Sequence, residues 1–339
     1  MKTIWKVIIL LIAAGLILSL LAIFLGASRW VYWDVSGSHI GDNSYERITE
    51  LDLEQIKNIE IFADFSNIEF IESDKYGIDI CYFNKEVAWN LDDGNLSISS
   101  KSKNKFHFFN IDLSFQNPKE YIKVFLPAGV QLGTVSVETG DGDIRIGNFS
   151  ADDVQIKNSF GKLDIFLITC HTLQIELADG AFTGEHVSVQ GDMEYKNDFG
   201  ISKFKTIQAK HVTIQCSDGD ITLNDCKVES IDIRNGFGSI VANNLISLQT
   251  TIHAEDGNIS VSGEFLGQTV IHNNFGNTEF TTSKPKEDYT YNISTEFGNV
   301  TVDNDKSRSS MYSHNGASEN SLCITNSDGN ITVNFAKHG

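Results

Sequence analysis

Proline is nearly absent from this 339-residue chain, which contains 3 prolines against 27 glycines. That composition excludes a collagen-like or proline-rich linker structure. Positive charge is also scarce, because 26 Lys and Arg stand against 45 Asp and Glu and leave a formal net charge of −19. Such an acidic chain repels phosphate backbones, so we predict no nucleic-acid partner. Because 41% of the residues are hydrophobic and only 21% are charged, the chain can bury a core and general disorder is excluded.

The cysteines and a search for common catalytic motifs give no indication of an enzymatic activity. The five cysteines contain no Cys-x-x-Cys pair and are Cys81, Cys170, Cys216, Cys226 and Cys323. We expect them to be buried thiols. The chain also lacks a nucleophile elbow, a phosphate-binding loop, a dinucleotide fingerprint and a His-Glu-x-x-His zinc motif. No cofactor is therefore predicted.

One uninterrupted apolar run, Val7 to Gly26, is 20 residues long. At about 1.5 Å per residue, a helix of this length crosses the ~30 Å hydrocarbon layer, so we predict a transmembrane anchor. Lys2 and Lys6 precede the run and only Arg29 follows closely, which predicts a cytoplasmic N-terminus and an external remainder. A cleaved signal peptide is the alternative, although Leu25 to Ala27 matches a cleavage site poorly.

An internal repeat marked by a glycine dominates the rest of the chain. From residue 134 onward, these glycines recur at intervals of 19 or 20 residues and then at two longer intervals: Gly142, Gly161, Gly180, Gly200, Gly219, Gly238, Gly257, Gly276, Gly298 and Gly329. The residue five before each glycine is apolar in all ten copies, and the residues two and four after it are mostly apolar. Each repeat therefore predicts two short strands with one buried face, joined at the glycine by a turn.

These patterns divide the chain into an anchor, a linker and one ectodomain. The predicted segments are a cytoplasmic stub and anchor over 1–33, a juxtamembrane linker over 34–49 and a β-solenoid ectodomain over 50–339. Within the ectodomain, we predict an irregular start over 50–133, regular repeats over 134–302, a Ser- and Asn-rich loop over 303–320 and a final repeat over 321–335.

Charge order along the repeat distinguishes stacked coils from flat hairpins. In a stack, equivalent residues of neighbouring coils lie about 4.8 Å apart, so like charges repel. The residue four before the glycine alternates in sign through Glu138, Lys157, Glu176 and Lys196. We therefore predict an all-β fold, a single elongated β-solenoid or parallel β-helix with about 19 residues per coil. A flat meander with Asp-Gly hairpin turns is the alternative.

The residue directly before the glycine alternates as well. Aspartate occupies every second copy: Asp141, Asp179, Asp218 and Asp256. Phenylalanine occupies the copies between them, within an Asn-x-Phe-Gly motif: Phe160, Phe199, Phe237 and Phe275. Carboxylates in this column would lie about 9.6 Å apart, where water and salt largely screen them. The working unit is thus predicted to be a pair of coils.

The segment from Tyr121 to Leu132, the strand Gly142 to Ile146 and the closing segment Ser327 to Val333 are similar to a known family. It is the bacterial "putative adhesin" β-strand-repeat family, also called LiaG-like, and the resemblance extends from Ile48 to Phe335. It implies a β-solenoid in an exported, envelope-associated bacterial protein that is commonly tethered to the membrane. It supplies no catalytic residues.

The aspartate column is the first candidate for chemistry. Its spacing of about 9.6 Å approaches the separation of an inverting pair of carboxylates in a glycosidase, so a wall-polysaccharide hydrolase or lyase is an alternative function. However, aspartate before glycine is a common turn residue, and these aspartates recur with the repeat. We therefore predict a turn role and no enzymatic activity. Repeated Gly-Gly-x-Gly-x-Asp calcium loops are absent from the sequence.

His253 and His272 occupy consecutive copies of the position four before the glycine. In a stack they would lie about 4.8 Å apart, where two imidazoles can share a metal or respond to pH. Zinc sites normally have three or four ligands, and only two are visible, so we predict surface positions and no metal site.

We predict a single-pass bacterial membrane protein whose extracytoplasmic solenoid serves cell-surface binding or adhesion, or acts as an envelope-associated interaction scaffold. The expected partners are the membrane itself and a cell-wall polymer or another surface or membrane protein. Contact would be made through a long face, the 303–320 loop or the tip distant from the membrane. An accessory role in an envelope-stress response is a further alternative, implied by the resemblance.

Overall fold

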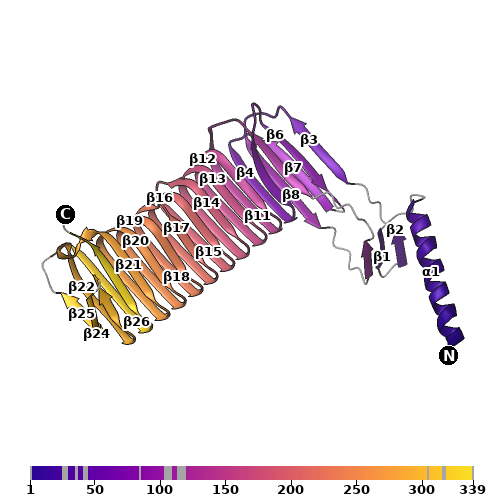
Figure 1. Cartoon of the computed structure of the whole chain (residues 1–339). Coiled ribbons are helices and arrows are strands. Elements are labelled where there is room, and N and C mark those ends of the chain that lie inside the picture. The colour runs from indigo at the N-terminus through magenta and orange to yellow at the C-terminus, as the bar shows by residue number, and fades with distance from the viewer. Residues whose placement is uncertain are drawn as a thin grey trace.

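The computed structural model describes residues 2–24, 30–34, 37–40, 45–83, 85–102, 109–112, 120–303, 305–314 and 318–337. These residues form a helix, a short 3₁₀ turn (Lys286–Asp288) and the strands of two sheets. Figure 1 shows a long stack of coils, with helix α1 beyond one end and the C-terminus at the opposite end.

The N-terminal elements precede the stack. Helix α1 (Lys2–Phe24) forms over the apolar run. In the described part of the chain, no helix has both the length and the hydropathy that a membrane crossing requires. The anchor over residues 7–26 therefore stays a prediction. Strands β1 (Trp30–Asp34), β2 (Gly37–Ile40) and β9 (Phe109–Asp112) form a small antiparallel sheet, so part of the segment predicted as a linker is strand.

Successive coils pair side by side in parallel. Glu138 lies opposite Lys157, and Lys157 lies opposite Glu176, so each coil is shifted by 19 residues along the chain. This register confirms stacked coils and contradicts the flat hairpin alternative. The strands of the regular coils are β11 (Val130–Asp141), β12 (Ile144–Phe160), β13 (Leu163–Asp179), β14 (Phe182–Val189), β15 (Asp192–Phe199), β16 (Ser202–Asp218), β17 (Ile221–Asn224), β18 (Lys227–Phe237), β19 (Ile240–Asp256), β20 (Ile259–Phe275) and β21 (Thr278–Pro285).

The repeat positions predicted to be apolar form the core. The residues five before, two after and four after the ten glycines are all buried, including the polar Ser202 and Thr278. These two hydroxyls are satisfied inside the stack. Ser202 Oγ lies 2.7 Å from the Tyr195 hydroxyl, and Thr278 Oγ1 donates to Asn326 Oδ1 at 2.9 Å. A buried polar group that keeps a hydrogen bond avoids most of its desolvation cost.

Each coil also turns at a second corner, which the glycine pattern does not reveal. In β12 the buried positions fall into three runs separated by breaks in the alternation: Ile144, Ile146 and Gly147, then Phe149 and Ala151, then Val154, Ile156 and Asn158. The first break lies at the sixth position after the glycine, where the backbone has φ between 51° and 61° in successive coils: Asn148, Leu167, His186, Thr206, Asp225 and Asn244. Because five residue types, including Leu and Thr, occupy this left-handed conformation at the six positions, no single residue type marks it.

The repeat glycines are required because neighbouring coils approach one another closely at this turn. Gly219 has φ 143°, and a Cβ on it would lie 2.0 Å from the carbonyl oxygen of Gly200 in the neighbouring coil. Gly257 has the same relation to Gly238, at 2.1 Å. A side chain here would therefore be strained by its backbone and would also push two coils apart.

At the C-terminal end, the order of coils in space differs from their order in the chain. Strands β26 (Asn320–Asp328) and β27 (Ile331–Ala336) pair in parallel with β20 and β21 on one side. On their other side they pair with β22 (Tyr289–Phe297) and β23 (Val300–Val302). The last repeat of the sequence therefore lies in space between the coil of β20 and β21 and the coil of β22 and β23, although it follows both in the chain. Strands β24 (Asp305–Ser309) and β25 (Met311–His314), within the segment predicted as a loop, pair antiparallel with that outer coil.

The N-terminal end is built in the same way. Strands β4 (Asn58–Phe65) and β5 (Asn67–Glu72) lie between the first regular coil and an outer coil made of β8 (Asn95–Ser102) and β10 (Tyr121–Leu126). Antiparallel strands then close the stack: β3 (Glu46–Leu51), β6 (Gly77–Tyr82) and β7 (Lys85–Asp92). Both ends therefore carry an inserted coil and antiparallel closing strands, which reduces the parallel edge open to another chain.

Substituting the glycine corner tests this close approach. We expect Gly219→Ala to lower the free energy of unfolding by more than about 2 kcal/mol, because φ strain and overpacking each cost about 1–3 kcal/mol. Gly129→Ala is the matched control, since Gly129 also has positive φ, at 65°, but has open space around its Cβ position. Chemical denaturation of both variants measures the difference. Equal losses would contradict a requirement imposed by coil contact.

Candidate functional site

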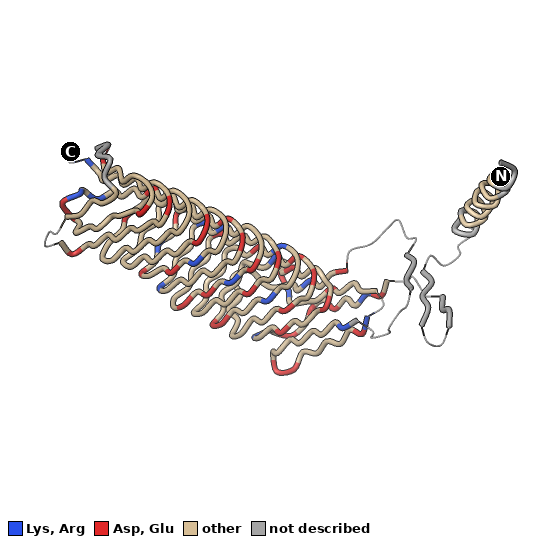
Figure 2. Tube along the Cα trace, turned by 90° about the horizontal axis from the view of Figure 1, so that it is seen from below, with Lys and Arg blue, Asp and Glu red and all other residues tan. Residues whose placement is uncertain are grey.

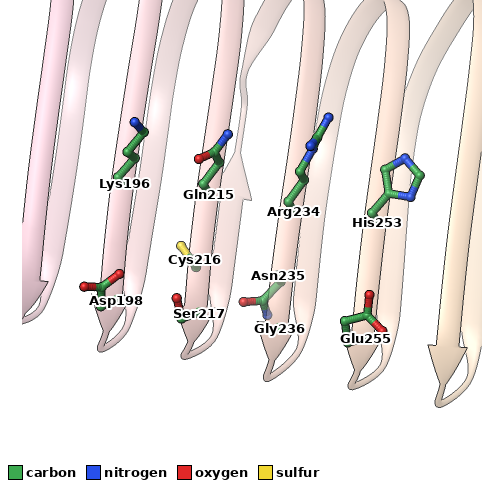
Figure 3. Close-up of a pocket in the computed structure, with 10 residues that line it drawn as sticks. All are labelled: Lys196, Asp198, Gln215, Cys216, Ser217, Arg234, Asn235, Gly236, His253 and Glu255. Carbon is green, nitrogen blue, oxygen red and sulfur yellow. The ribbon is translucent and has the colours of Figure 1, made fainter.

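A shallow groove runs along one face of the stack, across strands β15, β16, β18 and β19. Its volume is about 640 Å³. Figure 3 shows two rows of side chains bordering it. One row comprises Lys196, Gln215, Arg234 and His253, and the row nearer the glycine turns comprises Asp198, Ser217, Gly236 and Glu255. The first row is basic or neutral and the second contains two carboxylates, so the walls differ in charge.

The groove continues toward the N-terminal end. A second section of about 290 Å³ shares Lys196 and Asp198 with the first and extends past Glu176, Lys157 and Glu138. Strand alternation explains the lining, because residues two and four before the glycine point outward while those three and five before it point inward. The same two positions of each coil therefore form the walls over many coils. Figure 2 shows acidic residues along the full length of the stack, with basic residues interspersed.

The charge column of the sequence forms the first wall. The register places Glu138, Lys157, Glu176, Lys196, Gln215, Arg234, His253 and His272 next to one another in that order. Lys157 Nζ lies 3.4 Å from Glu176 Oε2, and both side chains are more than half exposed. An exposed pair of this kind contributes at most about 1 kcal/mol. The alternation of charge therefore serves mainly to prevent repulsion between neighbouring coils, and its ion pairs add little to the stability of the fold.

The asparagines of the Asn-x-Phe-Gly motif lie beneath the groove and are almost fully buried: Asn158, Asn197, Asn235 and Asn273. Each Nδ2 donates to the carbonyl oxygen of the repeat glycine in the preceding coil, at 3.0–3.1 Å. Each Oδ1 has no hydrogen-bond partner among the described residues. The motif thus joins coils at the turn, a role that its spacing alone did not predict.

The two histidines lie together as expected from the stack. The His253 and His272 rings are stacked, with centroids 5.0 Å apart and planes 20° apart. His272 Nδ1 also contacts the Thr325 hydroxyl of the inserted last coil. Burial, and then the neighbouring His253, lower the pKa of His272. Within the part of the chain that the structure describes, no group of three or more His, Cys, Asp or Glu residues is arranged to hold a metal ion.

The aspartates before the glycines lie exposed at the turn, outside the groove: Asp141, Asp179, Asp218 and Asp256. A phenylalanine coil separates each from the next, so they form no close carboxylate pair. The neighbouring Asp143 and Asp220 have a structural role, because each Oδ1 accepts the backbone N–H of the next coil, at 2.9 and 2.8 Å. Asn258 and Asn277 make the same contact.

The inserted coils extend the Asp and Phe alternation beyond the sequence repeat. In chain order, the last three residues of this column are Phe275, Phe297 and Asp328, which breaks the alternation. In space, Asp328 lies between the two phenylalanines, and at the other end Phe65 lies beside Asp141. We call the resulting row the Phe/Asp column; its order is Phe65, Asp141, Phe160, Asp179, Phe199, Asp218, Phe237, Asp256, Phe275, Asp328 and Phe297.

A cluster of charged residues at the N-terminal end departs from the repeat. Arg47 donates two hydrogen bonds of 2.7 Å to the buried Asp79, which also accepts from Thr49 and Tyr121. The hydrogen bond from Arg47 lowers the pKa of Asp79 despite its burial. The nearly buried Lys85 donates to Glu120 at 2.6 Å. These groups satisfy one another and fasten the closing strands.

The thiols are unsuited to nucleophilic chemistry. All five cysteines are free, and four of them are buried, with Cys323 partly exposed. Cys216 lies at the groove floor, and burial raises its pKa to about 11. The thiolate is the reactive form, so this thiol is inert at neutral pH.

The lowered pKa of His272 in the stacked histidine pair leads us to expect that the stability of the fold depends on pH. The unfolded His272 binds a proton with a pKa near 6.5, and the folded residue binds it more weakly. The folded chain therefore keeps the full contribution of neutral His272 to its stability above that pH and loses it as the pH falls below it. We expect the unfolding midpoint of the native chain to fall further between about pH 8 and pH 5 than that of His272→Gln. Parallel thermal scans measure this, and equal falls would contradict it.

Comparisons with known proteins identify the family of the chain. No curated protein matches the chain significantly. A structure named "putative adhesin" from Bacteroides fragilis is 22% identical over 63% of this chain and 96% of its own, with a TM-score of 0.39. A "putative adhesin" from Parabacteroides distasonis is 13% identical over 86% of this chain and 98% of its own, with a TM-score of 0.44. A "putative lipid binding protein" from the same species is 14% identical over 88% of this chain and 98% of its own, with a TM-score of 0.43. Residues 56–334 match a family model, and the chain therefore belongs to the Toastrack DUF4097 family.

Proposed function

We propose that this chain is a cell-surface binding protein whose solenoid presents an elongated groove to an extended ligand. The observation that carries the proposal is the continuity of the groove, because its two sections share Lys196 and Asp198. Each coil contributes one residue to each wall, so the surface repeats along the stack and suits a polymer or an extended protein segment. In the section across β15 to β19, the basic or neutral wall with Lys196 and Arg234 faces a wall that contains Asp198 and Glu255, which favours a ligand with polar groups along both sides.

Helix α1 is proposed to tether the solenoid to the bacterial membrane, with the N-terminus in the cytoplasm and the stack outside. The support is its apolar surface, since Ile9, Leu10 and Leu18 are more than 60% exposed. Large exposed apolar patches mark membrane or protein contacts. The C-terminal end of the stack lies far from α1 and would be the part most distant from the membrane (Figure 1).

Binding is better supported than hydrolysis or lysis of a wall polysaccharide. The groove is lined by positions that recur with the repeat, whereas a catalytic site is local and irregular. Two acidic side chains beside the aspartate column, Asp143 and Asp220, accept hydrogen bonds from backbone N–H groups of the next coil. The charged cluster that does break the repeat, around Asp79, is occupied by its own ion pair.

Charge reversal in the groove tests the proposal. The full chain in detergent is used to capture components of a bacterial envelope extract, and Lys196→Glu with Arg234→Glu is compared with the native chain. We expect the double variant to retain the captured component at least tenfold more weakly, about 1.4 kcal/mol, because one wall changes sign.

Lys203→Glu with Lys227→Glu is the matched control, because these exposed lysines lie on other sides of the same stack and the net charge changes equally. The control should bind like the native chain. Equal weakening by both double variants, or no captured component with the native chain, would contradict the groove as the binding surface.

A further inference from the structure

The Phe/Asp column lies beside the groove and is not explained by packing. Its six phenylalanines are between 51% and 70% exposed: Phe65, Phe160, Phe199, Phe237, Phe275 and Phe297. Single exposed apolar residues are ordinary, but a straight row of six at a constant interval is not a scatter. The row also persists through both ends of the stack, where the chain order is rearranged.

The phenylalanines do not stabilise one another. Two coils separate each ring from the next, about 9.6 Å, whereas paired aromatic rings have centroids 4.5–7 Å apart. Each gap contains one aspartate, for example Asp218 between Phe199 and Phe237. The column therefore presents apolar rings that alternate with carboxylates, and at its N-terminal end Lys85 Nζ lies 5.6 Å from the centroid of the Phe65 ring.

This alternation matches the chemistry of an uncharged sugar chain. A pyranose presents an apolar C–H face, which an exposed ring can cover, and hydroxyl donors, which an ionised carboxylate accepts. In an extended β-1,4-linked glycan, successive sugars are turned over, so the same face returns once per disaccharide. That repeat is comparable in length to two coils, the interval between phenylalanines.

Charge narrows the class of ligand. The chain carries a net charge of −19, and the column adds an aspartate between each pair of rings, so acidic polysaccharides are repelled. The same repulsion opposes pairing of this edge with a second copy of the chain. An uncharged glycan avoids both penalties.

We propose that the Phe/Asp column is a binding edge for an extended, uncharged β-1,4-linked glycan, with one disaccharide per pair of coils. This inference goes beyond the groove-based function proposed above, because it assigns a ligand class to a second surface of the stack. The column is distinct from the groove, so the two surfaces can be separated by variants.

Calorimetric titration of the full chain in detergent provides the test. The probes are the hexasaccharides and disaccharides of β-1,4-linked glucose and β-1,4-linked N-acetylglucosamine. At least one hexasaccharide should bind, and its disaccharide should bind at least tenfold more weakly because it reaches a single ring. A hexasaccharide of α-1,4-linked glucose, which curves away from a straight row, should not bind.

Phe199→Ser with Phe237→Ser should weaken hexasaccharide binding at least tenfold. Leu167→Ser with Leu248→Ser is the matched control, because these leucines are 55% and 48% exposed outside the column. The control, and the groove variant Lys196→Glu with Arg234→Glu, should bind the hexasaccharide like the native chain. Circular dichroism verifies that each variant is folded.

The inference is overturned if neither β-1,4-linked hexasaccharide binds, or if the phenylalanine variant binds like the native chain. It is also overturned if the native chain self-associates through the column and this association, rather than glycan binding, is lost in the phenylalanine variant. If glycan binding fails, capture of an envelope component that depends on Lys196 and Arg234 would still support the proposed function of the groove. If only that capture fails, binding of the hexasaccharide would still support the column as a glycan-binding edge.

Discussion

The close contact between glycine turns of neighbouring coils sets the geometry of the whole stack. The carbonyl of one repeat glycine lies where a Cβ of the next would be, so only glycine allows the coils to approach to strand-pairing distance at this corner. The buried asparagines, such as Asn235, then donate to these same carbonyls and hold the turns in register. Once the corner is fixed, every other position of the repeat is aligned in a column.

Alignment in columns explains both candidate surfaces. Identical charges on adjacent coils would repel at about 4.8 Å, and the sequence avoids this by alternating sign in one column and by alternating Asp with Phe in another. The first column becomes a wall of the groove, and the second becomes an edge of exposed rings. A surface feature repeated over many coils is suited to an extended ligand more than to a small substrate held at one point.

The two ends show how the stack is terminated. In each case, one coil is inserted out of chain order and antiparallel strands cover the outermost parallel coil. Parallel edges offer unpaired backbone groups to other chains, so this arrangement limits end-to-end association. The inserted coil also keeps Asp328 between Phe275 and Phe297, which preserves the column to the end of the stack.

The sequence by itself determined the repeat, the parallel register and the outward position of residues such as Lys157 and His253, because a translational repeat converts spacing along the chain directly into contact. It also indicated the family and the Asn-x-Phe-Gly motif. The second corner escaped it, since residues as different as Leu167 and Thr206 adopt the same left-handed backbone there. Only the tertiary structure decided the inserted coils and the pairing of Asp79 with Arg47, because these join segments whose separation in the chain departs from the repeat. It also decided the hydrogen bonds of the buried asparagines, because these depend on individual side-chain atoms that the spacing of residues does not specify.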